Sequence, residues 1–253
     1  SGVLTARGTA DNGRLNMTFF GQGIPLTVLA ARTGGLNLAG TVDAEGAVDG
    51  TTDAPRATFR FTAYNGQALQ QPFSVAKGGL TLTRTAVTLD AVEAVSGVTR
   101  HTLSGSVGLT GGRELNLTVV TRQARAENLI KLIMPGERLT GNIDNEVTIT
   151  GPMAAYTAEG RVKLSEGSFR GQLIARAEGS YRRAGGATEL HDFVVNSLNA
   201  ELRFDGRISA DNRLDLKVTA KDIDLAAVHI NFPYPVAGRA NFAGQLTGTL
   251  SAP

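Results

Sequence analysis

Apolar and polar residues alternate strictly along most of this chain. In the run from Leu198 to Ile208, one parity is apolar or small and the other carries Asn, Glu, Arg, Asp and Arg. Successive side chains of a β-strand point to opposite faces, so this run predicts a strand with one apolar and one charged face. We expect the following residues on such apolar faces: Phe59, Phe61, Leu80, Leu82, Leu103, Val107, Leu109, Leu115, Leu117, Ile143, Val147, Ile149, Val162, Leu164, Leu198, Leu202, Phe204, Ile208, Leu214, Leu216, Phe242 and Leu246.

Turn-forming pairs separate the alternating runs and predict hairpins between them. These pairs are Gly34-Gly35, Asn65-Gly66, Gly78-Gly79, Gly111-Gly112, Gly185-Gly186 and Asp211-Asn212. The best helical pattern covers only residues 126–133 and stops before Pro135-Gly136, so it predicts at most about two turns of helix. The predicted fold class is therefore all-β, with antiparallel strands.

A motif returns along the chain with a period of about 100 residues. The segment from Ala39 to Pro55 resembles the one from Ala237 to Pro253 at a constant offset (237 − 39 = 198), and a third copy begins near Gly141. Leu-x-x-apolar steps follow in phase, at Leu26/Leu29, Leu129/Leu132 and Leu225/Val228. The repeat predicts the end of one copy at 1–38, copies at 39–137 and 138–236, and the start of another at 237–253, within one continuous β-structure.

The composition is that of a folded domain, and it argues against several classes of function. The chain has 253 residues, 42% hydrophobic and 19% charged, which is typical of a folded domain. It has no cysteine, and its net charge of +2 comes without a run of basic residues, which argues against a nucleic-acid partner. The three histidines are far apart, and no nucleophile-elbow or phosphate-loop motif is present. We therefore expect no enzyme, no cofactor and no metal site.

The apolar faces indicate an unusual architecture. They are rich in Leu, Val, Ala and Gly, and no amphipathic helices are available to cover them. About 20 strands spaced about 4.8 Å apart would extend about 100 Å, too far for a flat sheet or one small barrel. We expect an elongated, curved antiparallel sheet that forms a half-pipe with a hydrophobic groove, lined by the apolar residues given above.

The repeated motifs resemble those of the TamB/AsmA-like family of envelope proteins. The resemblance lies in the Gly-x-apolar-x-apolar-x-x-Gly strands closing in Ala-Pro, and in the Arg-Leu-Asn/Asp-Leu strand before a Leu-x-x-Leu step. It implies a β-taco in the periplasm of a diderm bacterium, a bridge along which the acyl chains of phospholipids move between inner and outer membranes, or which assists outer-membrane assembly. It also implies an inner-membrane anchor and a BamA-superfamily outer-membrane barrel as partner, both contacted through regions outside this chain.

Two alternatives stay open at this point. A secreted adhesive β-solenoid has rungs near 20 residues, which a period near 100 disfavours. Tandem β-sandwich modules acting as a spacer or adhesive fit a period of about 100 residues better. Against them, the junctions at Gly40, Gly141 and Gly238 carry strand pattern where linker composition would be expected. The Ser1 start, without Met or a signal peptide, suggests a piece of a longer protein.

Overall fold

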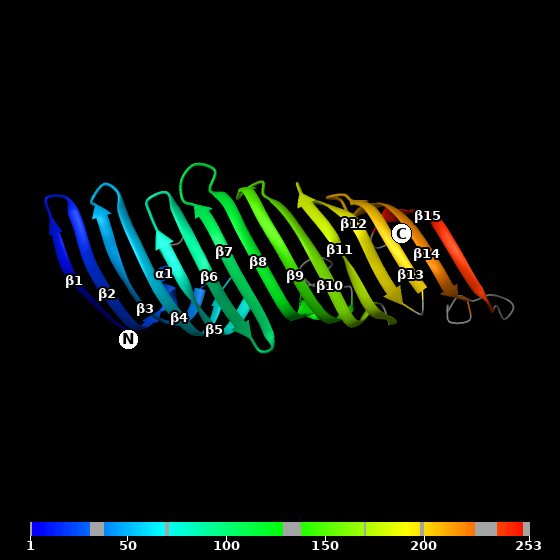
Figure 1. Ribbon diagram of the computed structural model, residues 1–253, viewed down its shortest axis with the longest axis horizontal. Helices are drawn as coiled ribbons and strands as arrows, with labels where there is room; N and C mark the ends of the chain where they lie inside the picture. Colours follow the sequence, from blue (N-terminus) through cyan, green and yellow to red (C-terminus); the bar gives the residue numbers. More distant parts are fainter. Residues whose placement is uncertain are drawn as a thin grey trace. The chain divides into compact units, whose positions relative to one another are not determined.

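The computed structural model describes residues 2–30, 38–68, 71–128, 138–169, 171–197, 200–225 and 237–249 (Figure 1). Its strands follow one another along an antiparallel sheet in the order of the chain, as a meander. The strands are β1 (Val3–Asp11), β2 (Arg14–Pro25), β3 (Leu38–Thr51), β4 (Pro55–Ala68), β5 (Gln71–Leu82), β6 (Ala86–Ser96), β7 (Thr99–Gly108), β8 (Glu114–Arg125), β9 (Leu139–Pro152), β10 (Thr157–Phe169), β11 (Gln172–Ala184), β12 (Ala187–Ser197), β13 (Ala200–Ile208), β14 (Arg213–Asp224) and β15 (Arg239–Thr249). The prediction of an all-β, antiparallel fold is confirmed.

The chain divides into two compact units. Unit 1 comprises Ser1–Val120 with Thr150–Ala154, and unit 2 comprises Thr121–Ile149 with Ala155–Pro253. In the described part of each unit, extensive contacts between strands join only consecutive strands, and the short helix α1 (Leu26–Ala30) contacts β2 and β3. Within the described ranges, each unit is therefore one sheet of consecutive paired strands, with no second sheet packed on it.

The strand register gives each unit one apolar and one polar face. In unit 1, Phe59 of β4 lies opposite Gly46 of β3 and Leu80 of β5. One residue further along β4, Arg60 lies opposite Glu45 of β3. Directly opposed residues of antiparallel strands share a face, so the two parities extend across the strands as an apolar row beside a charged row. The alternation in the sequence is the cause of both faces.

Several predicted turns are turns in the structure, and two are not. Gly111-Gly112 and Gly185-Gly186 connect β7 to β8 and β11 to β12, as predicted. Asp211-Asn212 likewise lies between β13 and β14. Asn65-Gly66 and Gly78-Gly79 were wrong as turns, because they lie inside β4 and β5. Gly34-Gly35 lies outside the described residues.

The two glycines inside strands have a packing role that the turn interpretation missed. A Cβ on Gly66 would lie 2.3 Å from Cζ of Phe73, and one on Gly78 would lie 2.7 Å from Cα of Val92. Neighbouring side chains thus occupy the space where a larger residue would put its own. Glycine at these positions permits close packing within the sheet and does not end a strand.

Each unit has a short helical segment directly after one of its strands. Leu26, the first residue of α1, is buried against Val42, Ala63 and Ala76 of unit 1. In unit 2, residues 126–128 are helical, and Ala126 is fully buried beside Ile143. Of the other residues in these steps, Leu29 belongs to α1 and Leu225 follows β14, whereas Leu129, Leu132 and Val228 lie outside the described residues, as does 129–133 of the predicted helix. In the part of the chain that is described, no helix has the length and apolar character to cross a membrane.

Candidate functional site

The apolar face of unit 1 contains the predicted residues of its strands. Phe59, Phe61, Leu80 and Leu82 lie on the shared apolar rows of β4 and β5. On β7, Leu103 and Val107 lie opposite Val92 and Val87 of β6. The rings of Phe19 and Phe59 meet edge to face, 6.0 Å apart, across Gly46 of the strand between them. Glycine on β3 thus allows aromatic contact between strands two positions apart.

The predicted residues at the end of unit 1 are placed less directly. Leu109 follows β7, where its backbone N–H donates to the Thr85 carbonyl at 2.8 Å, and its side chain is exposed. A Cβ on Gly105, a glycine of the apolar face, would lie 3.0 Å from Cα of Leu117. Leu117 is therefore the neighbour of that face on β8, and alternation places Leu115 on the same side.

In unit 2 the register again collects the predicted residues on one face. Leu202 and Phe204 of β13 lie opposite Ala220 and Val218 of β14, and Ile208 lies opposite Leu214. Leu216 lies opposite Leu246 of β15, and Phe242 opposite Ala220. Val162 and Leu164 of β10 lie opposite Gly179 and Ala177. Ile143 packs in the same cluster as Leu164, and alternation puts Val147 and Ile149 on its side of β9. Leu198 lies outside the described residues.

Most side chains of the apolar faces are only partly buried. Leu214 and Leu216 are 7% and 5% exposed, whereas Leu82 and Phe242 are 40% and 55% exposed. Among the described residues, no large side chain is completely buried. Such a face is sheltered by neighbouring side chains and by a helical segment at one end, and among the described residues no further layer covers it. Contiguous exposed apolar surface is typical of a binding surface.

A few polar side chains interrupt the apolar faces, and apolar periodicity could not reveal them. In unit 1, His101 of β7 lies opposite Ala94, and its burial lowers the pKa of its imidazole. In unit 2, the Tyr181 hydroxyl donates to Oδ1 of Asn145 at 3.1 Å. Burial raises the pKa of Tyr181, although the hydrogen bond with Asn145 acts in the opposite direction. Arg183, two residues along β11, donates from Nη1 to the Thr188 hydroxyl at 3.4 Å.

The polar faces carry ordered charges. In unit 2, Glu159, Arg182, Glu189, Arg207 and Asp215 lie opposite one another on five consecutive strands. Arg182 forms ion pairs with Glu159 at 2.9 Å and with Glu189 at 3.7 Å. These pairs are largely exposed, so each adds little stability. They do show that charge complementarity supports the same strand register as the apolar rows.

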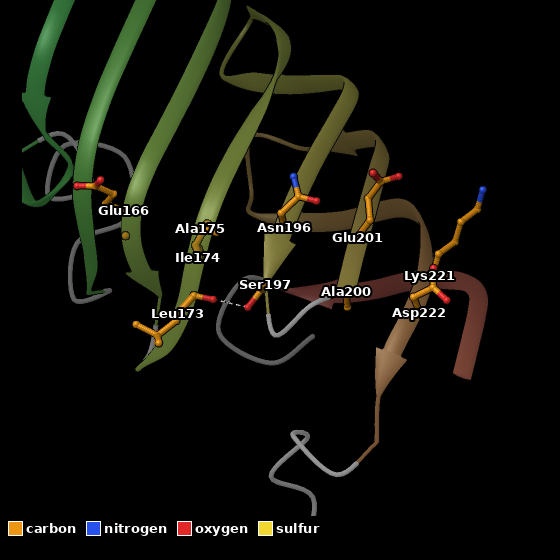
Figure 2. A pocket seen from close by; sticks show the side chains of 11 residues that line it. Glu166, Leu173, Ile174, Ala175, Asn196, Ser197, Ala200, Glu201, Lys221 and Asp222 are labelled. Atoms are coloured by element: carbon orange, nitrogen blue, oxygen red, sulfur yellow. Dashed lines mark hydrogen bonds between the residues drawn. The ribbon is translucent and has the colours of Figure 1, made fainter. Parts of the chain in front are cut away.

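Two hollows in unit 1 include predicted lining residues, Phe61 in one and Phe59 in the other, whereas a third hollow, in unit 2, includes none. The one drawn in Figure 2 has a volume of about 740 Å³ and lies at the strand ends of unit 2, between Glu166 of β10 and Asp222 of β14. Figure 2 shows Glu201 and Lys221 on its border and the hydroxyl of Ser197 donating to the Leu173 carbonyl. None of the predicted apolar residues lines this hollow, which mixes charged and apolar side chains.

The described residues offer no metal centre, since no three His, Asp or Glu side chains come close enough together to hold an ion. Comparison with known proteins gave no match to any family model, curated protein or solved structure. The apolar faces themselves are therefore the candidate functional site.

Proposed function

We propose that this chain is part of a lipid conduit in the envelope of a diderm bacterium. In this proposal the apolar faces of the sheet form the floor of a half-pipe groove that carries phospholipid acyl chains. The observation that carries the proposal is a single-layer sheet whose apolar face has no covering layer among the described residues. The motif resemblance to TamB/AsmA-like proteins supports the same function.

The physical basis is transfer of hydrocarbon out of water. Burying an acyl chain gains about 0.8 kcal/mol per buried CH₂, so a groove that encloses a chain of about 16 carbons would hold it strongly. A row of Leu, Val and Phe side chains offers many similar contacts and no chemically distinct stopping point. Such a surface retains lipid while allowing it to slide, and the proposed activity requires no catalysis and no cofactor.

We also propose that β3–β8 and β9–β14 are two copies of one six-strand repeat. Left-handed backbone conformations recur at matching positions, at Asn65 and Glu166, and at Ala91 and Asp192 (166 − 65 = 192 − 91 = 101). Glycines with positive φ recur at 40 and 141, 50 and 151, and 105 and 206, with the same offset. Equal spacing of such uncommon conformations supports a shared strand plan.

The cellular setting is part of the proposal. A conduit between two membranes would lie in the periplasm, with an inner-membrane anchor and an outer-membrane barrel of the BamA superfamily contacted by regions outside this chain. The motif resemblance is the support for these assignments.

The test is lipid retention by the purified protein. Native mass spectrometry after purification without detergent is expected to detect bound phospholipid. Val147→Arg and Leu202→Arg place a charge on the apolar face and are expected to abolish retention, because a buried charge is costly. Thr148→Arg is the matched control, since its side chain lies on the opposite face of β9.

Circular dichroism must show that each variant keeps its β-structure. Loss of lipid in Val147→Arg with retention in Thr148→Arg supports the conduit. A wild-type chain that neither carries nor takes up lipid contradicts it and favours the alternative of a spacer or adhesive module.

A further inference from the structure

Polar side chains interrupt the apolar face of unit 2 at neighbouring positions on β9, β11 and β12. Tyr181 and Arg183 of β11 share this face with Leu190, which lies opposite Tyr181. Thr188 lies opposite Arg183, and Asn145 reaches the Tyr181 hydroxyl from β9. We call Asn145, Tyr181, Arg183 and Thr188 the Arg183 cluster. Arg183 lies near the hairpin at Gly185-Gly186, about 20 Å along β11 from the buried Ala177.

The matching positions of unit 1 are all apolar. Under the proposed repeat, an offset of 101 pairs Tyr181 with Leu80, Arg183 with Leu82, Thr188 with Val87 and Asn145 with Ala44. Leu80, Leu82 and Val87 lie on opposed apolar rows in unit 1, as their counterparts do in unit 2. Unit 1 therefore forms the same strand pairing with apolar residues at all four positions. Folding does not require polar groups here, and a function in binding explains their presence together.

Glycine makes room for the cluster. Gly160 of β10 lies opposite Tyr181, and a Cβ at Gly160 would lie 2.8 Å from the hydroxyl oxygen of Tyr181. The matching residue of unit 1 is Phe59. The tyrosine ring thus lies over a position without a side chain, which directs its hydroxyl toward Asn145 on the strand beyond.

The cluster is rich in hydrogen-bond donors. Arg183 is exposed, and the part of the chain that the structure describes gives it no ion pair. Within the described ranges its guanidinium makes one bond, to Thr188, so most of its five N–H donors are not used there. The Asn145 amide uses its oxygen toward Tyr181, so its NH₂ group also remains as a donor. The Arg183 guanidinium and the Thr188 hydroxyl beside it can donate to phosphate oxygens, while the Asn145 amide lies on the other side of β11, two strands away.

Apolar surface borders the cluster on the same face. Leu190, Ile208 and Leu246 pack against the buried Leu214 and Leu216. A ligand with its head at Arg183 would therefore find apolar side chains for its tail without leaving this face. This combination is suited to an amphiphile and less suited to a free anion.

We propose that the Arg183 cluster binds the anionic phosphate head of an amphiphile whose tail lies on the adjoining apolar face of unit 2. This inference rests on the proposed lipid-binding function and adds selectivity to it. Unit 2 holds anionic lipids at a fixed position, whereas the matching part of unit 1 offers only apolar contacts.

The experiment compares ligands with the same tail and different heads. Isothermal titration calorimetry of the full chain uses dodecyl phosphate, dodecylphosphocholine and inorganic phosphate, with each detergent kept below micelle formation. We expect dodecyl phosphate to bind about tenfold more tightly than dodecylphosphocholine, the size typical of a hydrogen bond to a charged group. Arg183→Gln is expected to remove this preference. Arg182→Gln is the control, because it removes the same charge from the opposite face of the same strand.

The outcomes separate this inference from the proposed function. Equal binding of both detergents by the wild-type chain overturns the Arg183 cluster and leaves lipid binding intact. Binding of neither detergent overturns lipid binding and the cluster together. Inorganic phosphate binding as tightly as dodecyl phosphate overturns the role of the tail. Should Arg183→Gln not fold by circular dichroism, Arg183→Leu replaces it, since leucine occupies the matching position 82.

Discussion

At the scale of single residues, side-chain caps on strand irregularities recur along the chain. The backbone N–H of Gly23 donates to Oδ1 of Asp43 at 2.7 Å. Gln123 N–H donates in the same way to Asp144 at 2.9 Å, and Asp222 N–H to Asn241 at 3.0 Å. Each donor residue has positive φ, as a residue in a bulge often does. The Asx side chain thus satisfies a donor that the regular ladder leaves unpaired.

We predict that Asp43→Ala lowers the free energy of unfolding by about 1–2 kcal/mol, because the Gly23 N–H loses its partner. Asp43→Asn is expected to lose much less, since an amide oxygen accepts the same bond and Asn241 does so naturally. Urea unfolding monitored by circular dichroism measures both. Equal losses in the two variants would show that the carboxylate charge matters more than the hydrogen bond.

His101 predicts a pH dependence of stability. Its burial lowers the pKa of the folded state below the ordinary value near 6.5. As the pH falls below 6.5, the unfolded chain takes up the proton first, so stability decreases until the folded pKa is passed. We expect His101→Leu to remove this loss, because leucine at position 202 occupies the matching place on β13.

The measurement for His101 is the free energy of unfolding between pH 8 and pH 5 in wild type and variant, with the other histidines unchanged in both. The difference between the two proteins should be largest at low pH. A difference that stays constant over the range would contradict the assigned shift.

At the scale of elements, alternation predicted the strands and their faces but not their irregularities. Leu202 and Phe204, two residues apart, share the apolar face as expected. Leu190 and Phe193 are three residues apart, and strict alternation places them on opposite faces. Both lie opposite apolar-face residues because the chain bulges at Asp192, whose φ is positive. A bulge depends on one residue's backbone conformation and on its partner Asp205, and neither leaves a periodic signal.

In the candidate site, too, the sequence pattern predicted one part and missed another. The apolar rows follow from sequence period, since each row repeats one chemical type. The Arg183 cluster was missed because Tyr181 and Arg183 break that period, and Asn145 joins them only through strand pairing. A search for polar residues whose counterparts in the other proposed repeat are apolar would have found them.

The edge strand β1 gives a prediction for hydrogen exchange. All of its residues are exposed, and β2 is its one neighbour in the order of the sheet. An edge strand leaves part of its N–H groups unpaired, whereas β4 is paired on both sides by β3 and β5. We expect β1 amides to exchange faster than those of β4 in hydrogen-exchange mass spectrometry. Protection of β1 that rises with protein concentration would instead indicate pairing with a second copy.

At the scale of the whole molecule, the two proposed repeats would combine a common arrangement of strands with different surface chemistry. Glycines and bulges are placed alike in both, which keeps the apolar rows in matching positions. Exchanges between polar and apolar residues on the apolar rows include the Arg183 cluster and His101, whose counterpart is Leu202. A conduit built in this way would slide lipid over one repeat and hold it at the next, so selectivity could change without altering the fold.

This arrangement predicts the effect of making the repeats alike. The variant with Asn145→Ala, Tyr181→Leu, Arg183→Leu and Thr188→Val carries in unit 2 the residues that unit 1 already accommodates, so we expect it to fold. Transfer of a fluorescent anionic phospholipid from vesicles to the protein and on to acceptor vesicles should accelerate, because weaker holding appears mainly as faster dissociation. Transfer of a zwitterionic lipid with the same acyl chains should stay unchanged, as should both rates in Arg182→Gln. An equal change for the two lipids would mean that the cluster shapes the apolar face and does not recognise the lipid head.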